Sequence, residues 1–261
     1  MITNQKTALI TGASSGIGLE LSRLFARDGY HLLLVARSAD KLQALAAEMQ
    51  QDYGVNVTVF LSDLSQPGAA QEVYRQVQNQ GIQVDVLVNN AGFGILANLS
   101  DANLEDSLQM IQLNIASLTI LTQLFLPGMI NRHSGRILNV GSTGSFSPVP
   151  AMAVYAATKA YVLSFSEAIA AELRGTGVTV TALCPGVTMT GFQARSGVGS
   201  SRLNKMGSMS AAQVANIGYV ALQRGQTVVV PGFLNWLLAF STRLAPRSLI
   251  TNMSKRMMES S

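Results

Sequence analysis

The chain has 261 residues, of which 48% are hydrophobic and 12% charged, with a formal net charge of +4. That apolar fraction is ample for a hydrophobic core, and no segment is polar enough to predict disorder. A single cysteine, Cys184, excludes an intramolecular disulfide, and no spacing of Cys and His residues predicts a metal site. A secreted disulfide-stapled protein and a zinc-folded protein are therefore excluded.

Short apolar runs alternate along the chain with longer segments of helical period. The runs predict seven buried strands, at Thr7–Ile10, His31–Ala36, Val55–Leu61, Val84–Val88, Arg136–Val140, Val178–Leu183 and Thr227–Val230. The main helical segments between them are Ile17–Asp28, Asp40–Tyr53, Pro67–Gln80, Leu104–Ile130, Met152–Arg174 and Ala211–Gln223. Runs rich in Val, Leu and Ile without alternation are typical of a parallel sheet covered on both faces. This order predicts one doubly wound α/β domain over residues 1–261.

No targeting or membrane-spanning segment is expected. The first ten residues have no long apolar stretch and no small-residue cleavage site, so they do not predict a signal peptide. Ser107–Asn131 carries no charge, but several Gln, Asn, Ser and Thr residues interrupt it, whereas a spanning helix needs about 20 mainly apolar residues. This window predicts a buried amphipathic helix, and the protein is expected in the cytoplasm.

A glycine-rich loop, TGASSGIG at residues 11–18, follows the first strand and leads into a helix. Glycines let the backbone turn sharply and let a pyrophosphate approach it, and the N-terminus of the helix favours a phosphate. The spacing is G-x-x-x-G-x-G rather than the G-x-G-x-x-G of other dinucleotide-binding folds. We expect dinucleotide contacts from Gly12, Ser14, Ser15, Gly16, Ile17 and Gly18.

The end of the second strand indicates which dinucleotide binds. A site selective for NAD is expected to carry a carboxylate there for the ribose 2′-hydroxyl, but this chain has Ala36 followed by Arg37. A carboxylate would repel a 2′-phosphate, whereas a guanidinium binds one through two hydrogen bonds. The sequence favours NADP(H) over NAD(H), the alternative being that Arg37 is only a solvated loop residue.

Polar residues also follow the third and fourth strands. Asp63 and Leu64 come after the third, and Asp63 either accepts a hydrogen bond from an adenine amino group or caps the next helix. Asn90, Ala91 and Gly92 come after the fourth, where a side-chain amide suits a loop that must hold neighbouring backbone. Because the carboxyl ends of parallel strands meet at one edge of the sheet, we expect these residues around one ligand.

Tyr155 and Lys159 are four residues apart in a helical segment, which places both side chains on one face of the helix. A tyrosine with a pKa near 10 is a poor acid–base catalyst at neutral pH, and a nearby ammonium is expected to lower that pKa. Ser142 follows the fifth strand and is placed to donate to a substrate oxygen. Tyr-x-x-x-Lys alone is common on helices, so the other motifs decide its meaning.

Those motifs occur in a specific order. TGASSGIG at 11–18, NNAG at 89–92, YAATK at 155–159 and PG at 185–186 follow one another, with Asp63, Asn114 and Ser142 among them. On these residues the chain closely resembles the short-chain dehydrogenase/reductase family, in its branch of about 250 residues, over nearly its whole length. The resemblance implies a single Rossmann-type domain with a seven-stranded parallel sheet and helices on both faces. It also implies a catalytic tetrad of Asn114, Ser142, Tyr155 and Lys159.

The resemblance also implies a role for each residue of the tetrad. Tyr155 protonates the carbonyl oxygen as hydride arrives from the nicotinamide, and Ser142 stabilises the same oxygen. Lys159 binds the nicotinamide ribose and lowers the pKa of Tyr155. Asn114 binds a water that links Lys159 to solvent, or it is a polar residue that bends a long helix, and the two roles are compatible. The other contacts expected for the cofactor are Pro185, Gly186, Val187 and Thr190, with Thr188 as a rival to Thr190.

The substrate is expected beside the tetrad. Residues 186–210 are rich in Gly, Ser, Thr and Met, and the resemblance makes them a substrate loop that orders when ligands bind. An apolar pocket is expected from Phe93, Phe146, Met189 and Phe192.

The tail, residues 233–261, begins with the apolar block FLNWLLAF and continues with four basic residues. We expect it to cover the pocket, pack against a second subunit, or rest on an anionic membrane surface, and the first two are favoured. Residues 173–258 contain nine basic side chains and no acidic one, which presents either a positive field or only ordinary surface charge. By resemblance, residues 104–130 and 152–174 form the contacts of a homodimer or homotetramer.

These observations predict an NADPH-dependent carbonyl reductase, or alcohol dehydrogenase in the reverse direction. The substrate is either a 3-oxoacyl chain on an anionic carrier or a neutral hydrophobic ketone, and no nucleic-acid partner is expected. The acid-free stretch 173–258 favours the carrier-bound chain, and the apolar pocket suits both. The alternative function is a non-catalytic regulatory protein that binds NADP(H).

Overall fold

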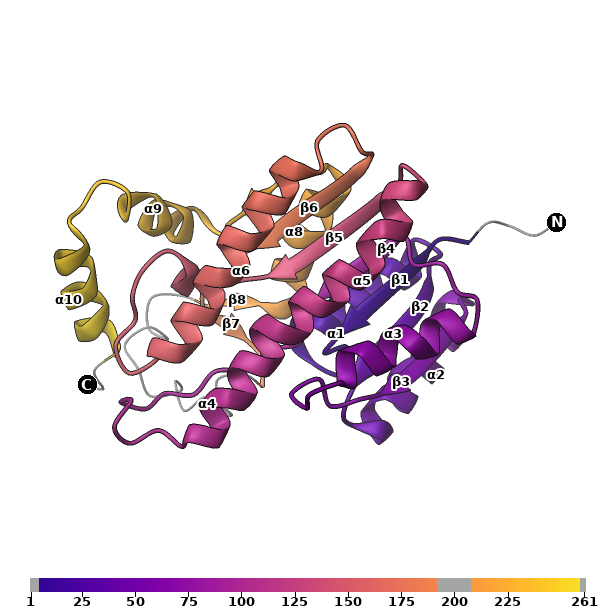
Figure 1. Cartoon of the computed structure of the whole chain (residues 1–261), viewed down its shortest axis with the longest axis horizontal. Coiled ribbons are helices and arrows are strands. Elements are labelled where there is room, and N and C mark those ends of the chain that lie inside the picture. The colour runs from indigo at the N-terminus through magenta and orange to yellow at the C-terminus, as the bar shows by residue number, and fades with distance from the viewer. Residues whose placement is uncertain (1–4, 192–207, 259–261) are drawn as a thin grey trace.

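A seven-stranded parallel sheet forms the centre of the computed structural model, which describes residues 5–191 and 208–258 (Figure 1). The strand order is β3-β2-β1-β4-β5-β6-β9. The strands are β1 Thr7–Thr11, β2 His31–Ala36, β3 Val57–Leu61, β4 Val86–Asn89, β5 Gly135–Val140, β6 Val178–Leu183 and β9 Val228–Val229. The order reverses between β1 and β4, where ligands bind in doubly wound sheets. The predicted fold class is confirmed.

Helices cover both faces of this sheet, as Figure 1 shows. One apolar cluster joins the sheet to α1 Gly16–Arg27, α2 Ala39–Tyr53 and α8 Ala211–Gln223. A second cluster joins the opposite face to α3 Ala69–Asn79, α5 Leu118–Asn131 and α6 Ala153–Glu172.

The strands are apolar throughout because both faces are buried. In β1, Ile10 packs into the first cluster and its neighbour Leu9 into the second, and both are fully buried. Leu32 and Leu33 of β2 divide between the faces in the same way. Each such leucine contributes roughly 1.5–3 kcal/mol relative to an exposed one.

The helix expected over residues 104–130 is interrupted. It runs as α4 Leu104–Ile111, a π-helical turn η1 Gln112–Ser117, and α5. Its 28 residues, Leu104–Asn131, are long enough to span a membrane and contain an 18-residue window with a mean hydropathy of 1.5, a match by length and composition only. However, α5 packs against α3, β4 and β5, as the core helix of the domain.

The C-terminal part adds smaller elements that the sequence did not predict. The short strands β7 Thr188–Met189 and β8 Met209–Ser210 pair in parallel and join the two ends of the expected substrate loop. Residues 192–207 of that loop, including Phe192, lie outside the described residues. The tail forms two helices, α9 Phe233–Ser241 and α10 Arg247–Met258, which project from the end of the molecule opposite the N-terminus (Figure 1).

Candidate active site

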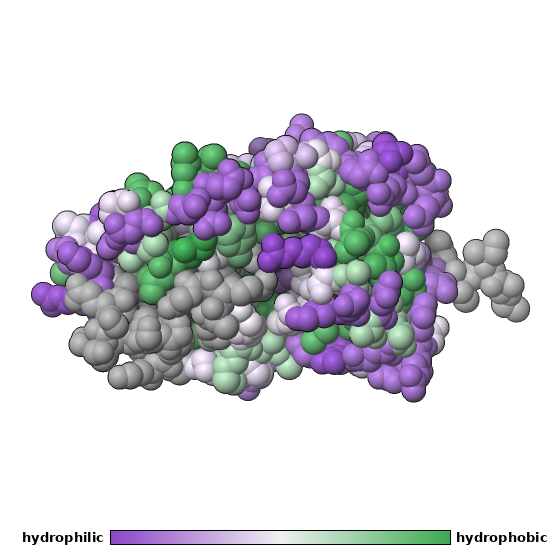
Figure 2. Space-filling view, turned by 90° about the horizontal axis from the view of Figure 1, so that it is seen from below, coloured by the Kyte–Doolittle hydropathy of each residue, from purple (hydrophilic) through white to green (hydrophobic). Residues whose placement is uncertain are grey.

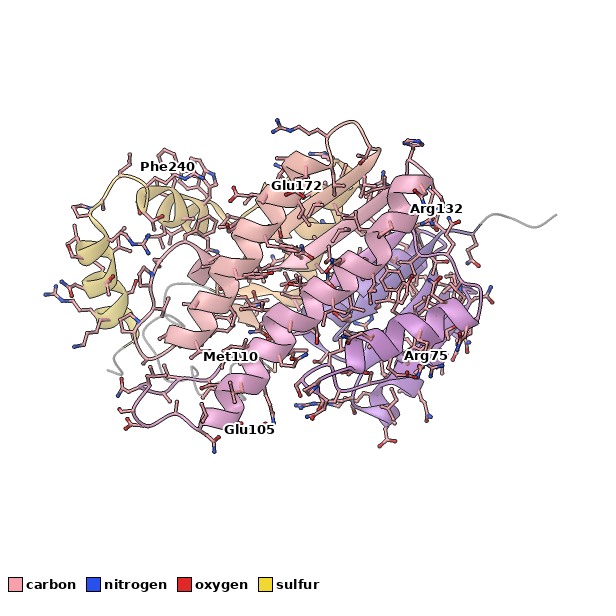
Figure 3. The ribbon with its side chains drawn as sticks, in the orientation of Figure 1. Arg75, Glu105, Met110, Arg132, Glu172 and Phe240 are labelled. Carbon is pink, nitrogen blue, oxygen red and sulfur yellow. The ribbon has the colours of Figure 1, made fainter. Side chains whose placement is uncertain are left out.

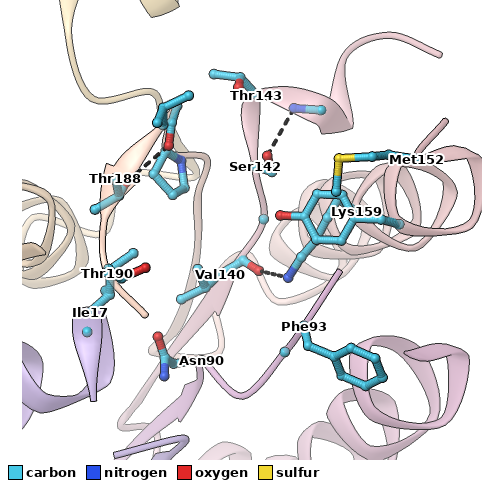
Figure 4. A pocket seen from close by; sticks show the side chains of 18 of the residues that line it. Ile17, Asn90, Phe93, Val140, Ser142, Thr143, Met152, Lys159, Thr188 and Thr190 are labelled. Carbon is cyan, nitrogen blue, oxygen red and sulfur yellow. Dashed lines mark hydrogen bonds between the residues drawn. The ribbon is translucent and has the colours of Figure 1, made fainter. Parts of the chain in front are cut away.

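A cavity of about 440 Å³ lies at the carboxyl ends of the central strands (Figure 4). Loops after β1, β2, β3, β4, β5 and β6 contribute to its lining, together with α6, α9 and α10. Nearly all residues expected to contact the dinucleotide line it: Gly12, Ser14, Ser15, Gly16, Ile17, Arg37, Asp63, Leu64, Asn90, Ala91, Gly92, Tyr155, Lys159, Pro185, Gly186, Val187 and Thr190.

The glycine-rich loop is held by the loop that follows β4. Gly12 has φ of 66°, and a Cβ on it would lie 2.8 Å from Nδ2 of Asn90. That Nδ2 donates to the carbonyl oxygens of Thr11 (2.9 Å) and Gly12 (3.2 Å). The Thr11 hydroxyl in turn accepts from the backbone N–H groups of Asn90 and Ala91, both at 3.0 Å. Only glycine fits at position 12, and Thr11 is a supporting residue to which the sequence analysis gave no role.

Gly18 differs from the other glycines of the loop because it does not line the cavity. A Cβ there would collide with the carbonyl oxygen of Gly12 and the Asn90 amide, so this glycine allows α1 to pack closely against the loop. Ser15, the N-cap residue of α1, makes no side-chain hydrogen bond to the helix. Helix N–H groups without a side-chain cap, together with the helix dipole, favour a bound phosphate.

Arg37 and Asp63 form the charged end of the cavity, after β2 and β3. The guanidinium Nη1 lies 4.0 Å from Oδ2 of Asp63, and the Arg37 side chain is 66% exposed. The other carboxylate oxygen of Asp63 accepts from the backbone N–H and the hydroxyl of Ser65, at 3.1 and 2.7 Å. Asp63 therefore stabilises its own loop, and the loosely held guanidinium is free to bind an anion.

Ser142, Tyr155 and Lys159 converge on the other side of the cavity. The ammonium of Lys159 is buried, donates to the carbonyl oxygen of Val140 at 2.8 Å, and lies 5.8 Å from the ring centre of Tyr155. Figure 4 shows Lys159 and Ser142 on one side of the cavity and Thr190 on the other. The hydroxyl of Ser142 accepts from the N–H of Gly144 at 3.1 Å and caps the 3₁₀ turn η2 Thr143–Ser145.

The pKa of Tyr155 differs from the value that the sequence predicted. Burial raises the pKa of the Tyr155 phenol to about 12, although its hydrogen bond with Ser142 opposes the rise. Burial also lowers the pKa of Lys159 to about 8. The sequence predicted a lowered tyrosine pKa from the nearby ammonium, whereas the structure gives a raised pKa with desolvation as its largest cause. The phenol is therefore fully protonated at neutral pH.

Asn114 lies in the π-helical turn η1 and is buried, without lining the cavity. Its Oδ1 accepts from the N–H of Phe93 (3.2 Å), and its Nδ2 donates to the Phe93 carbonyl and to Oγ1 of Thr158, both at 3.0 Å. Thr158 donates to the carbonyl oxygen of Tyr155 at 2.7 Å. Asn114 thus ties the loop after β4 to the helix that carries Tyr155, and single π turns are frequent at functional sites.

The apolar end of the cavity is only partly as expected. Phe93 and Phe146 line it, whereas Met189 is 57% exposed and does not. Thr188 and Thr190 both line it, and the hydroxyl of Thr188 donates to the carbonyl oxygen of Gly186 at 3.0 Å. Cys184 is fully buried, and burial raises the pKa of its thiol to about 12, so it is an inert core residue.

Residues from the tail complete the cavity. They share the inner sides of α9 and α10 and the turn between them: Leu238, Ala239, Ser241, Thr242, Ala245, Ile250, Met253 and Ser254. The sequence analysis placed the tail over the pocket as one option but named none of these residues. No helical spacing relates all of these residues, because α9 ends at Ser241 and Ala245 lies in the turn before α10.

Comparison with known proteins agrees with this geometry. Residues 6–199 match the family model described as short chain dehydrogenase. The chain is 30% identical over 253 residues to a very-long-chain 3-oxoacyl-CoA reductase of Anas platyrhynchos, covering 94% of this chain and 78% of that protein. It is 38% identical over 180 residues to the NADP-dependent 3-hydroxy acid dehydrogenase YdfG of Salmonella typhi, covering 69% and 71%.

Among solved structures, a short-chain dehydrogenase from Sphingobium yanoikuyae in complex with NADPH has a TM-score of 0.83 and 32% identity. The similarity covers 92% of this chain and 94% of that one. The glycine cradle, the uncapped helix N-terminus and the free guanidinium of Arg37 all suit the same dinucleotide. The chain belongs to the short-chain dehydrogenase family and is an NADP(H)-dependent oxidoreductase acting on CH–OH and C=O groups.

Proposed function

We propose that this enzyme reduces a hydrophobic ketone or aldehyde with NADPH. The observation that carries the proposal is the charge distribution in the cavity. Among the described residues that line it, the charged ones are Arg37, Asp63 and Lys159. Arg37 and Asp63 follow β2 and β3, which lie on the other side of β1 from the strand that precedes Ser142. The ammonium of Lys159 donates a hydrogen bond to the carbonyl oxygen of Val140. The described lining therefore offers the substrate end no cation for the carboxylate of a small oxo acid.

Apolar side chains surround that end instead. They come from the body of the domain and from the tail: Phe93, Leu113, Phe146, Val149, Met152, Leu238, Ala239, Ile250 and Met253. Burying an apolar substrate against them is favourable by about 25 cal/mol for each Å² removed from water. A ketone or aldehyde with a bulky or long hydrocarbon group matches this lining.

The cofactor would be held by residues already described. The loop around Gly12 and the N-terminus of α1 would bind the pyrophosphate, and Arg37 would bind the 2′-phosphate that distinguishes NADPH. Lys159 would bind the nicotinamide ribose, and backbone near Val187 with the hydroxyl of Thr190 or Thr188 would hold the carboxamide. NADPH supplies the hydride that reaches the carbonyl carbon.

Side chains of the protein stabilise and protonate the carbonyl oxygen of the substrate. Ser142 donates a hydrogen bond to the carbonyl oxygen and stabilises the charge that develops there. Tyr155, protonated at neutral pH because its pKa is raised, transfers its phenolic proton to that oxygen as the C–O π electrons move onto it. The ammonium of Lys159, 5.8 Å from the ring centre, stabilises the phenolate left behind. Asn114 positions the helix that carries Tyr155, and a water held by Asn114 stays a prediction.

A 3-oxoacyl thioester is the second candidate substrate. The duck relative is named for very-long-chain 3-oxoacyl-CoA, whose acyl chain would suit the same apolar lining. The acid-free stretch of residues 173–258 would attract an anionic carrier. The non-catalytic alternative has no support from a family of oxidoreductases, and the homodimer or homotetramer stays a prediction.

The test compares substrates at constant NADPH by following nicotinamide absorbance. We expect kcat/KM to rise from acetone to 2-decanone and to be lowest for acetoacetate, which is small and charged. A long-chain 3-oxoacyl-CoA that is turned over best, and that loses turnover steeply with added salt, would support the second candidate. A preference for acetoacetate over every neutral ketone would refute both.

A further inference from the structure

Helix α9 is apolar on two opposite sides. Leu238 and Ala239 line the cavity, as does Thr242 directly after the helix. The other side, which we call the outer tail face, carries large exposed side chains that do not line the cavity: Phe233 (76% exposed), Trp236 (48%), Leu237 (44%) and Phe240 (42%). The spacing of these four residues, at i, i+3, i+4 and i+7, places them on one face. Figure 3 shows Phe240 directed away from the body of the domain.

Three aromatic rings form a ladder along this face. The ring centres of Phe233 and Trp236 are 6.1 Å apart, and those of Trp236 and Phe240 are 5.6 Å apart, with interplanar angles of 25° and 10°. Large aromatic side chains exposed together carry a solvation cost that a monomeric surface seldom bears without a partner. Tryptophan rings favour the boundary between a hydrocarbon phase and water.

Basic residues follow the ladder along the chain. Arg243 lies in the turn after α9, and Arg247, Lys255 and Arg256 lie on α10, all exposed. None of the ion pairs among the described residues involves these four cations. The nearest acidic residue earlier in the chain is Glu172. Figure 2 shows hydrophobic and hydrophilic surfaces side by side at the end of the molecule that carries the tail.

We propose that the outer tail face docks on an anionic lipid bilayer, with the aromatic rings at the boundary of the acyl chains and the four cations among the headgroups. An exposed apolar face with a basic flank is the pattern of helices that lie in the membrane interface. A second copy of this chain is a poorer occupant, because a two-fold contact would bring the same uncompensated cations together.

A second exposed apolar face offers a contrast. Leu104 and Leu108 of α4 are 72% and 50% exposed, but Glu105 and Asp106 lie on the same helix. These carboxylates would repel anionic lipid, so the basic flank distinguishes the outer tail face.

Docking would also bring the cavity to the bilayer. The inner sides of the same two helices line the cavity, so a hydrocarbon-rich carbonyl compound dissolved in the membrane would meet the enzyme beside its substrate site. This consequence rests on the proposed function, whereas the docking itself does not.

Trp236 is the only tryptophan of the chain, so tryptophan fluorescence measures the environment of the outer tail face. We expect a blue shift of tryptophan fluorescence and co-sedimentation with phosphatidylcholine vesicles that contain about 30% phosphatidylserine, both reduced by salt. Vesicles of phosphatidylcholine alone should bind at least tenfold more weakly. Equal binding to both vesicles, or no change with either, would overturn the proposal.

Variants separate the charge from the apolar face. The quadruple variant Arg243→Gln, Arg247→Gln, Lys255→Gln, Arg256→Gln should lose on the order of 600-fold in vesicle affinity, since each cation near the surface contributes about fivefold. Phe233→Ser with Phe240→Ser should also weaken binding at least tenfold. The matched control Leu99→Ser changes a residue 68% exposed elsewhere and should bind as the wild type. Circular dichroism verifies that each variant is folded.

Two further results would overturn the proposal. A fluorescence shift that grows with protein concentration without vesicles, and that disappears in the Phe233→Ser, Phe240→Ser variant, would assign the face to a second copy and overturn the proposal. Unimpaired vesicle binding by the quadruple variant would also overturn it. Failure of docking would leave the carbonyl reduction assay unaffected, because that assay contains no vesicles.

Discussion

The two walls of the cavity are built in different ways. On the wall formed by the sheet and α6, Lys159 is almost fully buried, and so is Asn114 of η1 behind it; the polar contacts that place them involve backbone or another buried group. On the wall formed by the tail, Ala239 is the one buried residue of α9, and the described side chains of α10 are all partly or fully exposed.

This difference assigns proton transfer to the buried wall and substrate binding to the tail wall. Proton transfer requires the phenol and the serine hydroxyl within a few tenths of an ångström of their positions, which buried hydrogen bonds can maintain. A hydrophobic substrate needs only apolar area, which loosely packed helices supply and which sequence changes there can alter at little cost to the fold. Substitutions on the two walls should therefore affect different kinetic constants.

The largest effect is expected on the buried wall, from Tyr155→Phe. Removing the phenolic proton donor should lower kcat by about 10²- to 10⁴-fold while NADPH still binds. Steady-state kinetics and a direct binding titration with NADPH measure the two quantities. Tyr161→Phe is the matched control, because Tyr161 lies on the same helix and its hydroxyl contacts Thr119 outside the cavity. Turnover retained in Tyr155→Phe would remove the proposed mechanism.

Lys159→Met tests the burial of that wall through the pH dependence of the free energy of unfolding. Burial lowers the lysine pKa to about 8, whereas an unfolded lysine titrates near 10.5. Between these two pKa values the unfolded chain binds more protons than the folded chain, so the wild type's free energy of unfolding increases with pH. Below pH 8 the burial of the ammonium lowers that free energy by its full amount. Relative to wild type, the variant's unfolding free energy should lose about 3 kcal/mol between pH 7 and 10.

Chemical denaturation at several pH values measures this difference. Lys255→Met, which changes an exposed lysine of α10 outside the cavity, should follow the wild type at every pH. A pH-independent difference between Lys159→Met and the wild type would show that the ammonium keeps an ordinary pKa.

Arg37→Glu addresses the cofactor end of the cavity. The guanidinium is loosely held, so its substitution should leave the fold intact but raise the KM for NADPH by about 10- to 100-fold, as expected for lost hydrogen bonds to a charged group. The KM for NADH should change little. Arg75→Glu, an exposed arginine on α3, is the control. An equal loss with both cofactors would place Arg37 away from the 2′-phosphate.

The sequence was most informative about the buried wall. Seven apolar runs predicted the sheet because strands covered on both faces must be apolar throughout, and residues at their ends had to share one edge. The sequence allowed Asn114 to bend a long helix, but its partners Phe93 and Thr158 were not predictable because they are distant in sequence. The raised pKa of Tyr155 was missed because burial cannot be read from the spacing of two residues.

The tail was harder to interpret for a physical reason. Its apolar residues lie on both sides of α9, so composition indicated only an apolar block and could not tell the side that faces the cavity from the side that faces outward. Met189 was misplaced for a similar reason, since an apolar residue near the site in sequence can still point to solvent.

The smallest effect is expected from Ile250→Ala on the tail wall. Ile250 lines the cavity, so losing its side chain should raise the KM for 2-decanone by about 3- to 10-fold, which corresponds to removing one or two methylene contacts. The kcat, and the kcat/KM for acetone, should stay within about twofold, because acetone is too small to reach α10 from Ser142. Leu249→Ala is the control, since Leu249 is 51% exposed and does not line the cavity. If Ile250→Ala instead lowers kcat for both ketones, the tail also positions the catalytic groups, and the division between the two walls fails.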